Sequence, residues 1–322
     1  MAEAQRGASE FDLIDRIRRR VLVRDDVLLG IGDDAALLQV PAGQCLVVAA
    51  DTLNAGVHFP EDTAPADIGC KALAVNLSDL AAMGAEPAWC TLSISLPASD
   101  ARWLDGFLDG FLELAQAHRV ALVGGDTTRG PLSIGITVHG FVAPGRALRR
   151  DAARLGDDVW VSGTPGDAAA ALAQWREGGP RDAFLRARLD RPTPRIALGR
   201  ALVDVAHACI DVSDGLLADL AHVCRASAVG ARIELDRLPL SDALRTAFDG
   251  DARHAMQAGG GDDYELCFTA PTQLRDEVER AARDAATPVA RIGRIVAGEA
   301  PCAVLGDGSV WQPARTGFDH FS

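Results

Sequence analysis

The chain has 322 residues, enough for two domains with substantial cores, and its 48% hydrophobic and 24% charged residues are ordinary for a globular protein. Its formal net charge of −13 argues against a general nucleic-acid-binding protein, because binding to a phosphate backbone needs clustered positive charge. The sequence shows neither a signal peptide nor an apolar run that could span a bilayer, so we expect a cytoplasmic protein without membrane or nucleic-acid partners.

The first part of the chain alternates expected helices and strands after a flexible tail over residues 1–10. The expected elements are a helix over 10–23, strands over 36–40 and 45–50, a helix over 65–83, a strand over 88–96, a helix over 99–118 capped by Ser99, and strands over 120–123 and 132–142. Pro65 suits the first turn of its helix, and Gly84 suits the end of the same helix. A turn over 143–146 closes an expected N-terminal domain of residues 11–145.

The remaining residues, 146–322, are expected to form a C-terminal domain. Its expected elements are a strand over 158–162, helices over 168–174, 182–189 and 194–206, a strand over 208–212, a helix over 216–226, a strand over 231–235, helical stretches to about 258, a strand over 264–269, a helix over 273–285 and a strand over 289–296. Strands and helices that alternate in this way indicate an α/β or α+β fold.

Seven aspartates stand out in the sequence, most of them beside glycine or small residues and several after apolar runs typical of strands. They are Asp33, Asp34, Asp51, Asp79, Asp126, Asp211 and Asp214. Carboxylates that converge in a cleft repel one another unless cations lie between them. Mg²⁺ is the cation that best suits sites made of oxygen atoms and phosphates. The pattern therefore points to metal-assisted phosphate chemistry.

Each acidic motif also has a purely structural interpretation. Residues 30–34 could form a plain hairpin turn, and residues 124–130 could be either a turn or a loop whose glycines let backbone N–H groups approach phosphate oxygens. Residues 211–215 form a strand-to-helix junction, where Ser213 or Asp214 could cap the helix or the helix N-terminus could favour an anion. Residues 259–265 could be a flexible loop or a ligand loop.

Two further polar features leave the same choice open. Asn76 and Asp79 lie in an otherwise apolar helix, where a buried polar group needs a partner, either a bound cation or a hydrogen-bond network. His58 follows the Asp51 segment closely, although a lone histidine is more often structural. Lys71 is the only lysine and fits neither a P-loop nor the lysine strand of protein kinases, so ATP would have to be bound by another architecture.

Three segments together resemble the superfamily of aminoimidazole ribonucleotide synthetase and selenophosphate synthetase. They are Gly30-Ile31-Gly32-Asp33-Asp34-Ala35-Ala36, Asn76-Leu77-Ser78-Asp79-Leu80-Ala81-Ala82-Met83-Gly84-Ala85 and Gly124-Gly125-Asp126-Thr127-Thr128-Arg129-Gly130-Pro131. Four more resemble the thiamine-monophosphate kinase family within it, namely Gly56-Val57-His58-Phe59, Asp211-Val212-Ser213-Asp214-Gly215-Leu216, Asp263-Tyr264-Glu265-Leu266 and Gly317-Phe318-Asp319-His320-Phe321. The similarity runs from about Phe11 to Phe321.

The resemblance implies an enzyme that phosphorylates thiamine monophosphate to thiamine diphosphate with ATP and several Mg²⁺ ions. It implies the two-domain fold of aminoimidazole ribonucleotide synthetase, an α/β (α+β) fold, and a homodimer whose N-terminal sheets pair. Residues matching the family's metal ligands are Asp33, Asp51, Asp79, Asp126, Asp211 and Asp214, of which Asp51, Asp79 and Asp126 are expected nearest the chemistry. Residues matching its ATP contacts are Gly125, Asp126, Arg150 and Ser213, and those matching its substrate contacts are His58, Asp262 and Phe318.

The chain departs from the family pattern at three places. Ala49 and Ala50 stand where Ser or Thr is usual, so a metal contact there must come from a backbone carbonyl or be lost. Asp262 replaces a glutamate and is one methylene shorter, and Phe318 replaces a tyrosine or tryptophan but can still stack on a cationic ring. The alternatives are a selenophosphate synthetase, which would want a reactive cysteine near a glycine-rich N-terminus, and a non-catalytic nucleotide-binding protein.

Overall fold

A computed structural model describes residues 10–178, 181–313 and 317–318, and in it the chain folds into two compact units. The N-terminal unit contains the described residues up to Leu80 together with Pro87–Pro144. The C-terminal unit contains Ala81–Glu86 and the described residues from Gly145 onward. Residues 1–9 of the expected tail, and residues 319–321 of the closing motif, lie outside the described residues.

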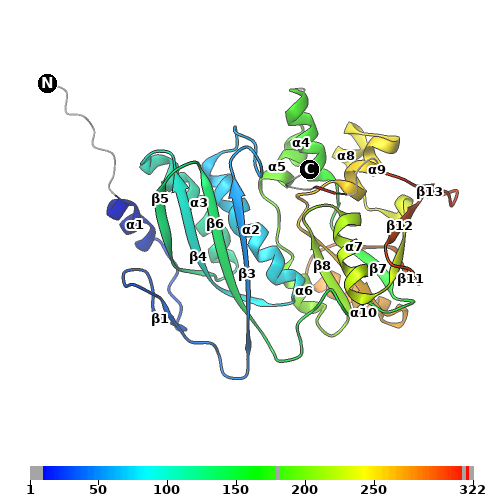
Figure 1. The fold of residues 1–322 in the computed structure, drawn as a ribbon, viewed down its shortest axis with the longest axis horizontal. Helices are drawn as coiled ribbons and strands as arrows, with labels where there is room; N and C mark the ends of the chain where they lie inside the picture. The colour runs from blue at the N-terminus through cyan, green and yellow to red at the C-terminus, as the bar shows by residue number, and fades with distance from the viewer. Residues whose placement is uncertain (1–9, 179–180, 314–316, 319–322) are drawn as a thin grey trace. The chain divides into compact units, whose positions relative to one another are not determined.

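The N-terminal unit is built on a four-stranded sheet in the order β3-β6-β4-β5, in which β3 and β6 are antiparallel and β4 and β5 are parallel (Figure 1). Its elements are α1 (Glu10–Arg18), β1 (Val27–Leu29), β2 (Leu37–Leu38), β3 (Cys45–Asn54), α2 (Pro65–Ala82), β4 (Glu86–Leu96), α3 (Ala101–Ala117), β5 (Ala121–Arg129) and β6 (Ser133–Val142). Helices α2 and α3 lie along one face of this sheet.

Helices α2 and α3 pack with their backbones in contact because glycines stand at the crossing. A Cβ atom on Gly69 would lie 2.0 Å from the carbonyl oxygen of Phe107, and one on Gly110 would lie 1.8 Å from that of Ala66. Helix α2 is apolar on nearly all sides, as expected for a helix that is buried all round. The sheet's other face is covered at one end by the β1–β2 ribbon, which packs on Trp89.

The C-terminal unit is built on a seven-stranded sheet in the order β13-β12-β9-β11-β7-β10-β8. Its elements are β7 (Asp158–Ser162), α4 (Asp167–Glu177), α5 (Ala183–Asp190), α6 (Ile196–Ala201), β8 (Ala208–Val212), α7 (Leu216–Ser227), β9 (Gly230–Glu234), η1 (Leu235–Arg237), α8 (Asp242–Ala247), α9 (Gly250–Gly259), β10 (Glu265–Ala270), η2 (Thr272–Leu274), α10 (Arg275–Asp284), β11 (Val289–Val296), β12 (Pro301–Val304) and β13 (Val310–Trp311). Every residue of β7, β8 and β10 is buried.

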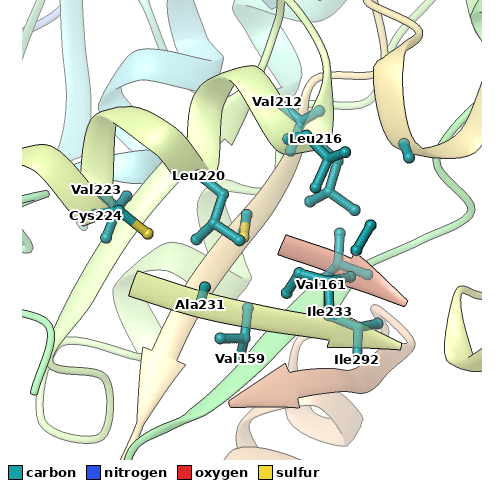
Figure 2. Close-up of a cluster of buried hydrophobic side chains, with 14 of the residues drawn as sticks. Val159, Val161, Val212, Leu216, Leu220, Val223, Cys224, Ala231, Ile233 and Ile292 are labelled. Carbon is teal, nitrogen blue, oxygen red and sulfur yellow. The ribbon is translucent and has the colours of Figure 1, made fainter. Parts of the chain in front are cut away.

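The core of this unit lies between the sheet and α7. Leu216, Leu220 and Val223 on α7 meet Val159 of β7 and Ile233 of β9, among other apolar side chains, as Figure 2 shows. The apolar positions on α7 recur at three- and four-residue spacing, which places them on the helix face that meets the sheet. The burial of this face holds the N-terminal turn of α7 against the end of β8.

Several expected boundaries prove wrong. Helix α3 is capped by Asp100, whose side chain accepts from the N–H groups of Arg102 and Trp103, and not by Ser99. The expected loop after residue 123 is instead the continuation of β5, because a bulge and the small Gly125 let the strand stay against β4: a Cβ atom on Gly125 would lie 1.8 Å from the carbonyl oxygen of Leu92.

Helices α1 and α6 are shorter than expected, and β1, β12 and β13 were not expected at all. The predicted helix tails beyond Arg18 and Ala201 contain β-branched valines, which favour helices less. The missed strands have only two to four residues, too few to show a period. Among the helices that the structure describes, none combines the length and apolar character needed to cross a membrane.

Candidate active site

The buried Asn76 of α2 fixes the position of Asp51. The backbone N–H of Asp51 donates to Asn76 Oδ1 at 2.9 Å, and Asn76 Nδ2 donates to the carbonyl of Ala72 at 3.0 Å. Asp79 lies three residues along the same helix and therefore on the same side as Asn76. The structure thus brings Asp51 and Asp79 to one region, and the polar group in the apolar helix belongs to a hydrogen-bond network. A hydrogen-bond network was one of the two explanations that the sequence left open for Asn76, but its contact with Asp51 was not expected.

The direction of this hydrogen bond also tells which alanine carbonyl faces outward. In an antiparallel pair, the N–H and C=O of one residue point to the partner strand and those of the next residue point away. Because the N–H of Asp51 points away from β6 to Asn76, the carbonyls of Asp51 and Ala49 face the open edge of β3. The Ala50 carbonyl is turned toward β6, so Ala49 is the better placed of the two to offer a backbone ligand.

His58 lies in the loop after β3, half-buried, with a defined tautomer. Its Nδ1 accepts the backbone N–H of Asn54 at 2.9 Å. In the neutral ring the proton is therefore on Nε2, which makes that atom a hydrogen-bond donor. A donor suits the phosphate oxygens expected at this position.

Asp126 lies apart from Asp51 within the chain. It pairs in register with Ser93 of β4, which is on the face of the sheet that the helices leave open, whereas Asp51 pairs with the buried Ile136 of β6. Two strands separate β3 from β5, which at normal strand spacing corresponds to about 14 Å. The sequence led us to expect Asp51, Asp79 and Asp126 near one another at the site of the reaction. Within one copy of the chain, Asp126 lies away from Asp51 and Asp79.

Asp33 lies on an exposed loop before β2. Its Oδ1 accepts the N–H of Asp34 at 2.8 Å, so the two neighbouring acids form a local turn. The loop passes close to the Arg18 guanidinium, which a Cβ atom on Gly32 would approach to 3.0 Å. The turn leaves both carboxylates exposed.

In the C-terminal unit, the junction between β8 and α7 is held by Asp219. Asp219 Oδ2 accepts the N–H groups of Ser213, Asp214 and Gly215 at 3.0, 3.1 and 3.0 Å. The helix begins after Gly215 and has no side-chain cap, so the alternative in which Ser213 or Asp214 caps it does not hold. The N–H groups that could have faced an anion ligand are already occupied by a carboxylate of the chain. Burial, reinforced by the nearby carboxylate of Asp211, raises the pKa of Asp219 to about 7.

The same junction gathers two of the three expected substrate residues. The N–H of Asp262 donates to the Ser213 carbonyl at 2.8 Å, and the N–H of Phe318 donates to the Asp214 carbonyl at 2.9 Å. Asp262 and Tyr264 have φ values of 69° and 51°, in the left-handed region that non-glycine residues rarely adopt. The Phe318 side chain is 49% exposed, which leaves part of its ring open to stack on a ligand.

The backbone of Arg150, an expected ATP contact, lies far from the backbone of Ser213. Its carbonyl accepts the Ser227 hydroxyl at 3.0 Å, and Ser227 is the last residue of α7, whereas Ser213 precedes the first. A helix of 12 residues is about 18 Å long, so the two backbones lie at opposite ends of α7. Arg150 is exposed.

A buried charged cluster anchors the segment that follows Asp262. Glu265 receives two hydrogen bonds from Arg195, at 2.7 and 2.5 Å, one from Arg188 at 2.7 Å and one from the Ser162 hydroxyl at 2.5 Å. Burial opposes ionisation of Glu265, but the hydrogen bonds and charge of Arg195, with Arg188, hold its pKa below the ordinary value. The sequence signal for this cluster was a glutamate that opens an otherwise apolar strand.

The neighbouring Asp263 is buried as well. Both of its carboxylate oxygens accept the backbone N–H of Gly166, at 3.0 and 2.8 Å. Burial raises the pKa of Asp263 well above its ordinary range. The 262–265 segment is therefore tied to β8, to Gly166 and to the arginine pair, which fixes the backbone that carries Asp262.

Within the described ranges no three acidic, histidine or cysteine side chains form a metal cage. Mg²⁺ is commonly held by one or two carboxylates together with substrate phosphates and water. Exposed aspartates with hard oxygen atoms, as at Asp33, Asp51 and Asp126, fit that kind of site.

Comparison with known proteins identifies the family to which the chain belongs. The family models described as AIR synthase related protein match over residues 32–142 for the N-terminal domain and 154–304 for the C-terminal domain. A thiamine-monophosphate kinase of Escherichia coli (strain K12) is 48% identical over 98% of this chain and 99% of its own length. The chain belongs to the thiamine-monophosphate kinase family.

Two solved structures match nearly the whole chain. The crystal structure of the enzyme from Stenotrophomonas maltophilia K279a is 55% identical, with a TM-score of 0.87 and coverage of 95% of this chain and 99% of that one. "AaThiL complexed with AMPPCP and TMP" is 32% identical, with a TM-score of 0.77 and coverage of 99% and 100%. The resemblance and the two-domain α/β fold expected from the sequence are thereby confirmed.

Proposed function

We propose that this protein transfers the γ-phosphoryl group of ATP to the phosphate of thiamine monophosphate, which yields thiamine diphosphate and ADP. The observation that carries the proposal is the similarity to thiamine-monophosphate kinases over nearly the whole chain. A relative solved with AMPPCP and TMP supports ATP and thiamine monophosphate as the two substrates. Incubation with ATP, Mg²⁺ and thiamine monophosphate should give thiamine diphosphate and ADP in equal amounts on chromatographic separation. Release of ADP without formation of thiamine diphosphate would contradict the proposal.

The main barrier to this reaction is repulsion between two anions. Mg²⁺ ions would neutralise the phosphate charges and align donor and acceptor, as in other phosphoryl transfers. The carboxylates proposed to hold them are Asp33, Asp51, Asp79, Asp126, Asp211 and Asp214, with the Ala49 carbonyl as a further oxygen ligand. An oxygen of a phosphate monoester is already largely deprotonated at neutral pH, so the chain needs no strong general base, and positioning carries the rate.

The remaining candidate residues bind and orient the substrates. His58 would donate from Nε2 to the phosphate of thiamine monophosphate, because its Nδ1 is committed to Asn54. Phe318 would stack on the cationic thiazolium or on the pyrimidine. Asp262 keeps a carboxylate where the family has glutamate, on a backbone fixed by Ser213.

For ATP, the proposed contacts are of three different kinds. Gly125 would offer its exposed backbone, while the Leu92 carbonyl of β4 lies where a side chain would stand. The Ser213 side chain, and not its N–H, would face the nucleotide, because Asp219 occupies the N–H. The exposed Arg150 would supply positive charge.

We further propose that two copies pair through the N-terminal unit. Large apolar side chains are exposed on β3, with Leu46 at 45% and Val48 at 53%, and on the β1–β2 ribbon, with Leu28 at 57% and Leu37 at 58%. Exposed apolar patches commonly mark protein interfaces. A dimer formed there would also cover the open face of the sheet that carries Asp126.

Sedimentation equilibrium at micromolar concentration should therefore give twice the chain mass for the wild type. Val48→Glu should give the monomer mass, because it places a charge in the proposed apolar interface. Val310→Glu, at a residue of the C-terminal unit that is 60% exposed, should stay dimeric and serves as the control. A monomeric wild type would overturn the dimer proposal. The expected cytoplasmic location stays a prediction.

A further inference from the structure

Asp219 holds a turn that lies outside its own helix. Its Oδ2 accepts three consecutive backbone N–H groups, those of Ser213, Asp214 and Gly215. A usual N-cap side chain serves the first turn of the helix that follows it. Here the acceptor belongs to the first turn of α7, and it reaches back to residues before that helix. Asp219 is buried, so water does not compete for these bonds.

The hydrogen bonds to Asp219 also fix the directions of carbonyl groups on the opposite side of the turn. A peptide unit is planar, and its N–H and C=O point in opposite directions. The N–H of Asp214 shares a peptide unit with the carbonyl of Ser213, and the N–H of Gly215 shares one with the carbonyl of Asp214. When Asp219 binds these N–H groups, it therefore also fixes the directions of the two carbonyls.

Those two carbonyls are the acceptors that hold the expected substrate residues. The Ser213 carbonyl accepts the N–H of Asp262 at 2.8 Å, and the Asp214 carbonyl accepts the N–H of Phe318 at 2.9 Å. Asp262 has a left-handed backbone with a φ of 69°, so its conformation depends on such support. One carboxylate thus orients a turn that contains the expected ATP contact Ser213 and contacts the expected substrate residues Asp262 and Phe318.

We propose that Asp219 is a positioning residue, which through the Ser213–Gly215 turn sets Asp262 and Phe318 for the thiamine phosphate and Ser213 and Asp214 for ATP and Mg²⁺. The inference rests on the proposed function for the roles of those four residues. It goes beyond it by assigning their alignment to the single buried carboxylate of Asp219, to which the proposed function gives no substrate contact.

Three variants separate positioning from a general loss of stability. Asp219→Ala removes the acceptor, Asp219→Glu keeps the charge but lengthens the side chain by one methylene, and Asp219→Asn keeps an oxygen at the same distance. Leu220→Ala is the matched control, because Leu220 is the next residue on α7, is fully buried in the core and has an apolar side chain that cannot accept the N–H groups of the turn.

We expect Asp219→Ala and Asp219→Glu to raise the KM for thiamine monophosphate at least tenfold, and Asp219→Asn to stay within about threefold of the wild type. Leu220→Ala should lower the melting temperature but leave KM and kcat within about twofold, measured well below that temperature. A wild-type KM in folded Asp219→Glu, or an equal change of KM in Leu220→Ala, would overturn the positioning role.

Amide hydrogen exchange tests the same role without the reaction. In Asp219→Ala or Asp219→Glu, the amides of Asp262 and Phe318 should exchange at least tenfold faster than in the wild type, while amides of β7 should change no more than in Leu220→Ala. Unchanged protection of Asp262 and Phe318 would refute the inference. A wild type that makes no thiamine diphosphate would refute the proposed function alone, since the exchange result stands independently.

Discussion

Asp126→Asn is expected to lower kcat for thiamine diphosphate formation by about a hundredfold to a thousandfold, the range seen when one electrostatic contact to a transition state is removed. Asparagine keeps the shape of the side chain but loses the charge proposed to hold Mg²⁺. The fold should be unaffected, because Asp126 is exposed and Asn can still accept the N–H of Thr127, which Asp126 Oδ1 now accepts at 2.8 Å. Turnover should be measured at saturating ATP, thiamine monophosphate and Mg²⁺.

The control for this variant is Asp25→Asn, another exposed aspartate of the N-terminal unit, to which no ligand role is assigned. Its kcat should stay within about twofold of the wild type. Because Asp126 lies on the open face of the sheet and away from Asp51, its effect also reports whether the assembled enzyme uses that face. Near-normal turnover of Asp126→Asn at saturating Mg²⁺ would remove Asp126 from the proposed metal site.

Glu265→Gln is expected to reduce the free energy of unfolding at pH 7 by about 3–5 kcal/mol, the usual cost of removing one partner from a buried ion pair. The variant leaves Arg188 and Arg195 without the carboxylate that they share. Denaturant titration with matched slopes gives the value. Glu279→Gln, on the exposed face of α10, should change it by less than about 0.5 kcal/mol. A loss below about 1 kcal/mol for Glu265→Gln would contradict this role.

The same variant should change how stability depends on pH. The folded-state pKa of Glu265 lies below its ordinary value of 4.5, so the folded protein binds this proton more weakly than the unfolded chain. The contribution of Glu265 to the free energy of unfolding is therefore present above about pH 4.5 and is lost as the pH falls through the folded-state pKa. In the wild type the free energy of unfolding should fall more steeply on acidification than in Glu265→Gln. Equal slopes below pH 4.5 would show that this glutamate does not contribute.

The elements that could be predicted from the sequence are those whose local pattern and tertiary role agree. The strands over 158–162, 208–212 and 289–296 were predicted with their observed bounds, because each contains β-branched residues and lies between turn residues. The end of β5 could not be predicted, since Gly124-Gly125 is a turn signal unless one knows that β4 lies against it. The cap of α3 differed by one residue, a choice between two good caps.

The family resemblance was enough to predict which residues form the candidate site. The buried side chains that hold those residues in place could be recognised only in the structure. Asn76 meets Asp51 across 25 positions, and Glu265 meets Arg195 across 70. Such contacts leave no periodic trace in the sequence. Asp219 is only six positions from Ser213, whose N–H it accepts. A capping side chain usually precedes the helix that it caps, whereas Asp219 lies within its helix and binds residues before it, so the capping pattern in the sequence does not reveal it. Three buried polar residues, Asn76, Asp219 and Glu265, thus hold the backbone of the candidate site.

Transfer of the γ-phosphoryl group of ATP to thiamine monophosphate is tested most directly by isotope tracing. ATP whose nonbridging γ-phosphate oxygens are heavy oxygen is incubated with the protein, Mg²⁺ and thiamine monophosphate, and the thiamine product is fragmented in a mass spectrometer. We expect thiamine diphosphate with all of these heavy oxygens on its terminal phosphoryl group and none on the inner one. A terminal group without the label, or no thiamine diphosphate at all, would contradict it.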